Sequence, residues 1–177
     1  MVVTPVPFVA LAPGTVSLCR SSRLLRPICP GRAPRVRAPY LVHLSRDPKS
    51  HVFDLERGAP RPRRTAPPWR AHITLVAGDV EHVAPFTYPQ RVSAPTTRLF
   101  HAQRRVAYSF GTRSWNGHAG TLYLAPPFLF GGQLGNHLVY RWRVGRIEYA
   151  VTLHAWAPLS QAIETLRAVV ESAPRQP

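Results

Sequence analysis

The segment from His137 to His154 constrains the fold more than any other part of this 177-residue chain. It reads HLVYRWRV, then Gly-Arg, then IEYAVTLH, and Gly145 stands where a two-residue type II′ turn prefers glycine. With that turn, one face of the hairpin carries the cross-strand pairs Val144–Ile147, Trp142–Tyr149, Tyr140–Val151 and Leu138–Leu153. All eight side chains are apolar or aromatic, and a slip of one residue would send them to the other face. The sequence therefore specifies the register strongly.

An amphipathic helix is expected directly after the hairpin. Pro158 fits its first turn, where the missing N–H costs nothing, and Pro174 marks its end. Its apolar residues recur at helical spacing and form one stripe: Leu159, Ala162, Ile163, Leu166, Val169 and Val170. The apolar face of the hairpin supplies the partner that this stripe needs. The predicted fold class is α+β, an antiparallel β-sheet with a C-terminal helix packed on one face.

Shorter strands are predicted upstream of the hairpin. The candidates are residues 51–56, 71–77, 97–101, 105–110 and 120–125, several of them ended by Gly or Pro. Because no helix-length crossover separates those after residue 70, we expect an antiparallel arrangement.

Proline and arginine divide the chain into two regions. Residues 1–70 contain 12 of the 20 prolines and 13 basic against 3 acidic residues, whereas residues 71–177 contain 10 basic and 5 acidic residues. Arginine and proline are densest in residues 20–37 and 58–70, which favours extended, linker-like backbone. We therefore expect residues 1–70 to be an irregular, basic, proline-rich region, partly disordered or loosely packed. Residues 71–177 are expected to form the α+β domain.

The N-terminal region leaves its cellular location open. Residues 1–18 are apolar but have no basic residue before the apolar stretch, and prolines interrupt it, so they resemble a secretion signal only loosely. Cys19 and Cys29 are the only cysteines, and three interpretations stand: two free thiols, which is the simplest, a disulfide in an oxidising compartment, or a metal or redox role. No run of about 18 apolar residues is present, so no transmembrane segment is predicted.

The formal net charge is +15, and 22 of the 23 basic residues are arginine. Near-total arginine beside abundant Ala, Pro and Gly is typical of a GC-rich genome, which explains the charge without a partner. The competing interpretation is affinity for nucleic acid, acidic lipid or another polyanion. Its candidate anion-binding residues are Arg61, Arg63, Arg64, Arg70, Arg104 and Arg105.

Signals for catalysis are weak. The eight histidines show no metal-ligand spacing, and His137 and His154 face each other across the hairpin, where we expect surface side chains at strand ends. The serines lack a nucleophile-elbow motif, and two of the eight acidic residues, Glu164 and Glu171, are expected on the solvated face of the helix, which does not favour a paired-carboxylate site. On the other face of the hairpin, Arg143 opposite Glu148 predicts a cross-strand ion pair. No catalytic, cofactor-binding or metal-binding residue is predicted, no cofactor is implied, and an enzyme is the least supported class.

One local recognition point stands out. Trp115 precedes Asn116-Gly117, so it could present an aromatic platform with Arg113 and His118 as polar neighbours. The alternative, which we prefer, is that Trp115 packs in the core while Asn-Gly makes a hairpin turn.

The ending of the chain carries a resemblance. The residues Tyr140-x-Trp142-x-x-Gly145-x-x-x-Tyr149, then Leu153-His154-x-Trp156-x-Pro158 and the following helix, resemble the ending of proteins from high-GC actinobacteria that have no assigned function. The match covers roughly residues 137–172, and it extends more distantly to small bacterial envelope domains in which such a hairpin precedes a closing helix. The resemblance implies a bacterial, envelope-associated protein and no particular chemistry.

Two function classes therefore remain. The first is a non-catalytic α+β module that binds a protein or small ligand at the bacterial cell envelope, with an extracytoplasmic location preferred to a cytoplasmic one. The second is an anion or nucleic-acid binder that uses the arginine-rich segments.

Overall fold

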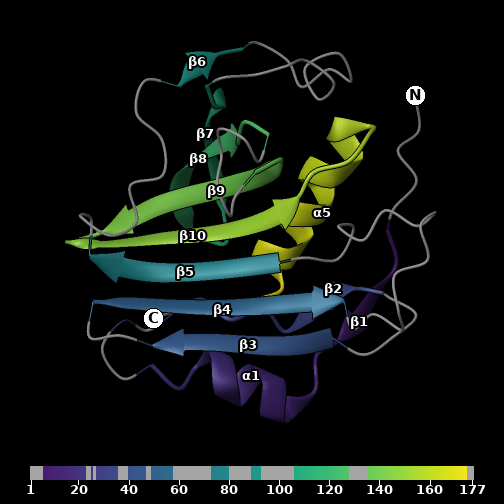
Figure 1. The fold of residues 1–177 in the computed structure, drawn as a ribbon, viewed down its shortest axis with the longest axis vertical. Coiled ribbons are helices and arrows are strands. Elements are labelled where there is room, and N and C mark those ends of the chain that lie inside the picture. The colour runs from purple at the N-terminus through teal and green to yellow at the C-terminus, as the bar shows by residue number, and fades with distance from the viewer. Residues whose placement is uncertain are drawn as a thin grey trace.

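The central feature of the fold is an eight-stranded sheet with the strand order β3-β4-β5-β10-β9-β8-β7-β6 (Figure 1). The computed structural model describes residues 6–22, 25, 27–35, 40–46, 49–57, 73–79, 89–92, 106–127 and 135–174. Neighbouring strands of the large sheet pair antiparallel, except that β6 is parallel to β7. A separate antiparallel pair, β1–β2, and two helices, α1 and α5, complete the described elements. The α+β class with an antiparallel sheet and a C-terminal helix is confirmed.

The bounds of the elements in chain order are β1 Phe8–Ala10, α1 Pro13–Cys19, β2 Arg32–Pro34, β3 Tyr40–Arg46, β4 Ser50–Arg57, β5 Ile73–Asp79, β6 Gln90–Arg91, β7 Tyr108–Trp115, β8 His118–Leu124, β9 His137–Val144, β10 Ile147–His154 and α5 Leu159–Glu171.

The predicted hairpin forms with the predicted register. β9 and β10 pair Val144 with Ile147 and continue without a shift to His137 opposite His154. Gly145 has a φ of 59°, a left-handed conformation that glycine adopts without strain. The helix α5 begins at Leu159, one residue after Pro158, and crosses the sheet beside β9 and β10 (Figure 1). The alternation of the hairpin and the stripe of the helix therefore predicted both elements.

Strands from both sides of residue 70 share the large sheet. β4 confirms the strand expected at residues 51–56, and it pairs with β5, which confirms the strand expected at residues 71–77. β3 adds an edge strand that the sequence analysis did not predict. The segment around the expected boundary, residues 58–72, and the strand expected at 97–101 lie outside the described residues.

The main core lies on one side of the sheet. Alternate residues of β4, β5, β8, β9 and β10 point to this side, and they are fully or almost fully buried: Phe53, Leu55, Ile73, Leu75, Leu122, Leu138, Val151 and Leu153. The apolar stripe of α5 packs against β9 and β10 and belongs to the same hydrophobic cluster, with Leu159, Ala162 and Leu166 each at most 1% exposed. We call this side the helix side of the sheet and the opposite one the far side.

The N-terminal segment is tied to the end of α5. The N–H of Gly31 donates to the carbonyl of Ser172 at 3.2 Å, and the hydroxyl of Ser172 accepts from the N–H of Arg32 at 3.2 Å. Leu25, Ile28 and Ala33 are buried in the same hydrophobic cluster as the sheet. These described parts of the first 35 residues thus pack against the domain.

Candidate functional site

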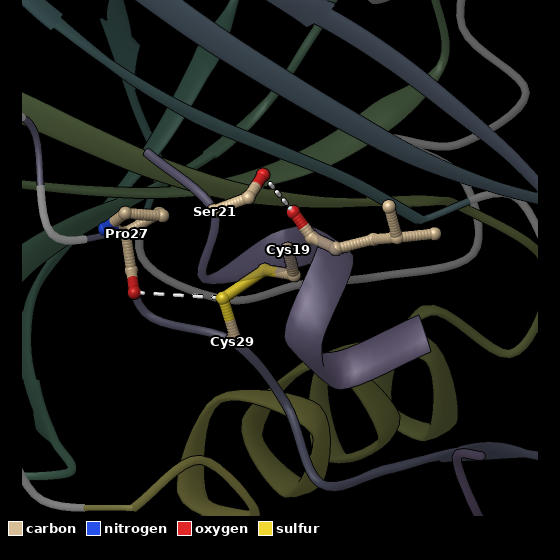
Figure 2. The surroundings of a disulfide bond; sticks show 5 residues. Cys19, Ser21, Pro27 and Cys29 are labelled. Atoms are coloured by element: carbon tan, nitrogen blue, oxygen red, sulfur yellow. Dashed lines mark hydrogen bonds between the residues drawn. A yellow bond between two sulfur atoms is a disulfide. The ribbon is translucent and has the colours of Figure 1, made fainter. Parts of the chain in front are cut away.

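A disulfide joins Cys19, the last residue of α1, to Cys29 in the segment before β2 (Figure 2). Of the three interpretations of the two cysteines, the structure shows the disulfide. Both residues are buried, at 1% and 3% exposure, and they belong to the main hydrophobic cluster. The Sγ of Cys29 lies 3.6 Å from the carbonyl oxygen of Pro27, a contact without a hydrogen bond because a bridged sulfur carries no hydrogen.

The bridge closes a loop that reaches the central hairpin. Ser21 tightens the start of this loop, since its hydroxyl donates to the carbonyl of Leu18 at 2.6 Å (Figure 2). Leu25, in the middle of the loop, is buried, and its carbonyl accepts the hydroxyl of Tyr149 in β10 at 2.8 Å. The bridge therefore holds a segment that contacts the sheet directly.

Aromatic rings line the helix side of the hairpin. Trp142 stacks on Tyr149 with ring centroids 5.4 Å apart and on His118 at the same separation. Tyr140 continues the row toward β7, where its ring lies 4.3 Å from that of Trp115. Trp142 and Tyr149 lie directly opposite each other in the predicted register of the hairpin, so this stack follows from the sequence pattern.

Tyr140 anchors the backbone of the neighbouring hairpin β7–β8. Its hydroxyl donates to the carbonyl of His118 at 2.6 Å and accepts the N–H of Trp115 at 3.3 Å. Burial raises the pKa of Tyr140 above its ordinary value of 10.0, and the hydrogen bonds from the backbone oppose the shift. Gly120 makes room for the ring, because a Cβ there would lie 2.6 Å from a Tyr140 ring carbon.

The proposed recognition point is divided between core and surface. Trp115 is only 6% exposed, so it forms no exposed aromatic platform. Asn116 and Gly117, with φ of 51° and 82°, make the tight turn between β7 and β8, as the preferred alternative expected. Arg113 is exposed and His118 is half-buried, so these two polar neighbours reach the surface without the tryptophan.

The proposed anion-binding arginines cannot be placed. Arg61, Arg63, Arg64 and Arg70 fall in residues 58–72, and Arg104 and Arg105 fall in residues 93–105, both outside the described residues.

The prediction that His137 and His154 are surface side chains is wrong. His137 and His154 do face each other, with ring centroids 4.7 Å apart, but they are 0% and 6% exposed and not on the surface. The prediction failed because the far side of the sheet is covered at this end: Val139 and Thr152 are also fully buried. The Nδ1 of His137 lies 3.0 Å from the carbonyl oxygen of Gly135, which fits an N–H donor at that nitrogen. Among the residues described, no group of three metal-ligating side chains gathers here or elsewhere.

The predicted ion pair of Glu148 has a different partner. Glu148 is 6% exposed and pairs with Arg141, whose Nε donates to a carboxylate oxygen at 2.7 Å, instead of with the directly opposite Arg143. Arg143 lies close to the turn and donates its Nε to the carbonyl of Gly145 at 2.8 Å. A long side chain reaches the diagonal position on the same face, and this leaves Arg143 exposed.

Arg141 and Arg143 share the far side with short side chains. Thr121 in β8 lies opposite Arg141 and also opposite Thr112 in β7, and Ser114 lies opposite Ala119. We call the resulting surface the arginine platform: Arg141, Arg143, Thr112, Ser114, Ala119 and Thr121. The sequence analysis identified the polar face of the hairpin but missed this group. The signal was the spacing Arg141-x-Arg143 on a strand, which puts both side chains on one face.

In the described parts of the chain, neither helix has both the length and the apolar character needed to span a membrane. Comparison of the chain with protein-family models, with curated proteins and with solved structures finds no match.

Proposed function

We propose that this chain is a non-catalytic binding module of the bacterial cell envelope. The observation that carries the proposal is the buried Cys19–Cys29 disulfide, which is part of the core and not an appendage. Disulfides form and persist in oxidising compartments and are rare in the cytosol. A bridge that holds Leu25 against the central hairpin is therefore best suited to an extracytoplasmic protein.

The buried polar side chains of the described core are engaged in structural contacts, which supports binding over catalysis. Glu148 forms an ion pair with Arg141, and the hydroxyl of Tyr140 forms hydrogen bonds with the backbone of β7 and β8. The hydroxyl of Tyr149 donates to the carbonyl of Leu25. Each of these contacts holds strands or segments together. Thr112, Ser114 and Arg143, by contrast, are exposed on one side of the sheet, which suits a partner that lies on that side.

The test is the redox state of the chain in the cell that produces it. Intact cells are treated with a membrane-permeant thiol-alkylating reagent before lysis, the envelope and cytoplasmic fractions are then separated, and the intact mass of the chain is measured with and without reduction before a second alkylation. We expect the chain in the extracytoplasmic fraction, with Cys19 and Cys29 alkylated only after reduction. A chain carrying Cys19→Ala and Cys29→Ala controls for alkylation elsewhere. Recovery from the cytoplasm with both thiols alkylated directly would overturn the proposal.

A further inference from the structure

β7 leaves part of one edge of the large sheet open. β6 pairs only with Tyr108 and Ser109, and no other described strand lies along β7 on that side. Beyond an irregularity in the register, three consecutive residues are exposed, and we call them the open edge: Thr112, Arg113 and Ser114. At the opposite edge of the sheet, the helix α1 contacts β3 (Figure 1). The two edges of the sheet therefore differ, and the one at β7 is accessible.

Hydrogen bonds to Tyr140 show which way the peptide groups of the open edge point. The N–H of Trp115 donates to the hydroxyl of Tyr140, and the carbonyl oxygen of Arg113 lies 3.3 Å from the same hydroxyl oxygen. This hydroxyl also reaches β8, so both of these peptide groups point toward β8. Because the peptide groups of an antiparallel strand alternate in direction, the N–H and C=O groups of Thr112 and Ser114 point away from β8, to the accessible side.

The same side of β7 already accepts a strand farther along. The N–H of Val92, directly after β6, donates to the carbonyl of Ser109 at 3.0 Å. The side chains of Thr112 and Ser114 are short, so they do not obstruct a strand that continues along this side. A strand edge with accessible N–H and C=O groups is a template to which a segment of another chain adds as a further strand.

The strands on this side of the sheet contain no carboxylate. No aspartate or glutamate occurs between Glu81 and Glu148, and β6, β7, β8 and β9 all lie in this interval. Arg91 in β6 and Arg113 in the open edge are exposed. Arg113 donates its Nη1 to the carbonyl of Thr112 at 2.9 Å, and its guanidinium carries further N–H groups that a carboxylate can accept.

Carboxylates of the C-terminal helix are engaged on the helix itself. The helix α5 also contacts β7, but both of its glutamates, Glu164 and Glu171, pair with Arg167. The open edge therefore offers main-chain groups beside a cation, which is the combination that suits an extended peptide with acidic side chains.

A second copy of the chain is a less suitable partner. Antiparallel pairing of two open edges about their centre would bring the two copies of Arg113 opposite each other, and like charges directly opposite destabilise a strand pair. The formal net charge of +15 adds repulsion between the two copies. An acidic partner meets neither cost.

We propose that the open edge binds an extended, acidic segment of a partner protein as an additional strand of the sheet. The inference rests on the proposed function, since it names the surface and the partner of the binding module. The main-chain groups of Thr112 and Ser114 hold the backbone of the segment, and Arg113 pairs with one of its carboxylates. Thr112 and Ser114 also belong to the arginine platform, so one face of the added strand lies beside that surface.

Fluorescence anisotropy with labelled octapeptides tests the proposal on the full chain. The probe alternates Glu and Thr, which supplies negative charge and the β-branched residues that favour a strand. A peptide of alternating Glu and Pro keeps the charge, but its prolines donate no hydrogen bond and favour polyproline II. A peptide of alternating Lys and Thr keeps the strand preference and reverses the charge. We expect the Glu–Thr peptide to bind about tenfold more tightly than either control.

Two substitutions at one position separate the main chain from the side chain. Ser114→Pro removes the outward N–H and leaves the pairing with β8 in place, since proline is tolerated where a strand N–H faces solvent. Ser114→Ala removes the hydroxyl and keeps the N–H. We expect the proline variant to weaken binding of the Glu–Thr peptide roughly tenfold and the alanine variant about twofold or less. Urea unfolding of both variants shows whether the fold is kept.

Amide hydrogen exchange of the unmodified chain gives a second measurement that needs no substitution. We expect exchange at the amides of Thr112 and Ser114 to slow when the Glu–Thr peptide is saturating. Exchange at Trp115 should stay unchanged, because its N–H points inward to Tyr140 with or without the peptide.

Several outcomes would overturn the inference. Equal binding of the Glu–Thr and Glu–Pro peptides would show that charge alone attracts the probe, and equal binding of the Lys–Thr peptide would remove the acidic preference. Unchanged exchange at Thr112 and Ser114 in the complex would place the peptide elsewhere. A chain found bridged in the envelope that does not bind the Glu–Thr peptide refutes this inference alone. A chain that binds the peptide at the open edge but is cytoplasmic and reduced refutes the proposed function.

Discussion

Removing the Cys19–Cys29 bridge should lower the free energy of unfolding by about 3 kcal/mol. The bridge links residues 10 apart in sequence. Closing a loop of that size in the unfolded chain removes conformational entropy worth about 3 kcal/mol at room temperature. For a chain of this length, the loss corresponds to a fall of roughly 6 to 12 °C in the melting temperature.

The burial of both cysteines determines how the loss of stability should be measured. Both cysteines are buried, so Cys19→Ala/Cys29→Ala also deletes two buried sulfur atoms and their packing. The wild-type chain in reductant keeps these atoms as thiols while it loses the covalent link. Urea unfolding followed by tryptophan fluorescence is therefore run on the oxidised chain, the reduced chain and the double alanine variant. Ser17→Ala, at an exposed position on α1, is the matched control.

The three unfolding curves separate the possible causes. We expect the reduced chain to lose about 3 kcal/mol and the alanine variant somewhat more, because the variant also loses the packing of two buried sulfur atoms, with Ser17→Ala unchanged within about 0.5 kcal/mol. If the reduced chain loses less than about 1 kcal/mol, the bridge does not restrain the unfolded ensemble as the loop entropy requires, and the reasoning is wrong. A large loss confined to the alanine variant would assign the effect to packing.

Three further perturbations address the central sheet and are read by the same urea titration. Tyr140→Phe should cost about 1 to 3 kcal/mol, because it leaves the carbonyl of His118 and the N–H of Trp115 without the hydroxyl; a neutral result would show that water replaces it. Gly120→Ala should cost about 1 to 3 kcal/mol, since its Cβ would lie 2.6 Å from the Tyr140 ring and 2.7 Å from the Arg141 carbonyl, whereas Gly14→Ala, with open space around its Cβ, should cost less. Stability should fall as the pH rises above 10, because burial raises the pKa of Tyr40 and Tyr140 in the folded chain: the unfolded chain loses these protons first, and an unfolding midpoint that stays constant between pH 9 and 11 would contradict the assignment.

The sequence predicted those elements whose pairing or periodicity is contained in one short, continuous segment. The hairpin β9–β10 contains its turn and both of its strands, so alternation alone fixes its register. The stripe of α5 is likewise local, and the apolar face of the hairpin is a partner of matching character. These two elements account for the correct fold class.

The elements that were missed depend on context. Prolines interrupt the apolar stretch of residues 1–18, yet Pro13 stands at the first position of α1, where the missing N–H costs nothing. β3 carries Tyr40, Val42 and Leu44 on one face, a short alternation that becomes a strand because β4 pairs with it. Two cysteines at this spacing allow a disulfide but do not require one, and it forms because the fold brings the end of α1 beside the segment before β2, with the two Cα atoms 5.8 Å apart.

The candidate surface was missed because register alone does not place long side chains. Direct cross-strand pairing puts Arg143 opposite Glu148, and both the expected ion pair and its face were inferred from that. The guanidinium of Arg141 instead reaches Glu148 along the diagonal and is held there away from solvent. Arg143, the arginine nearer the turn, is then exposed at the surface.

The two sides of the β9–β10 hairpin therefore carry separable roles. Trp142 and Tyr149 point to the helix side, where they stack and, through Tyr149, hold the loop closed by the disulfide. Arg141 and Arg143 point to the far side, where their hydrogen-bond partners among the described residues are Glu148 and the turn carbonyl. Because successive residues of a strand alternate between the two sides, a substitution on one side leaves the other side's contacts in place. Loss of the bridge should thus reduce stability and leave the contacts of the far side in place, whereas Arg143→Gln should change the far surface with little effect on the urea midpoint.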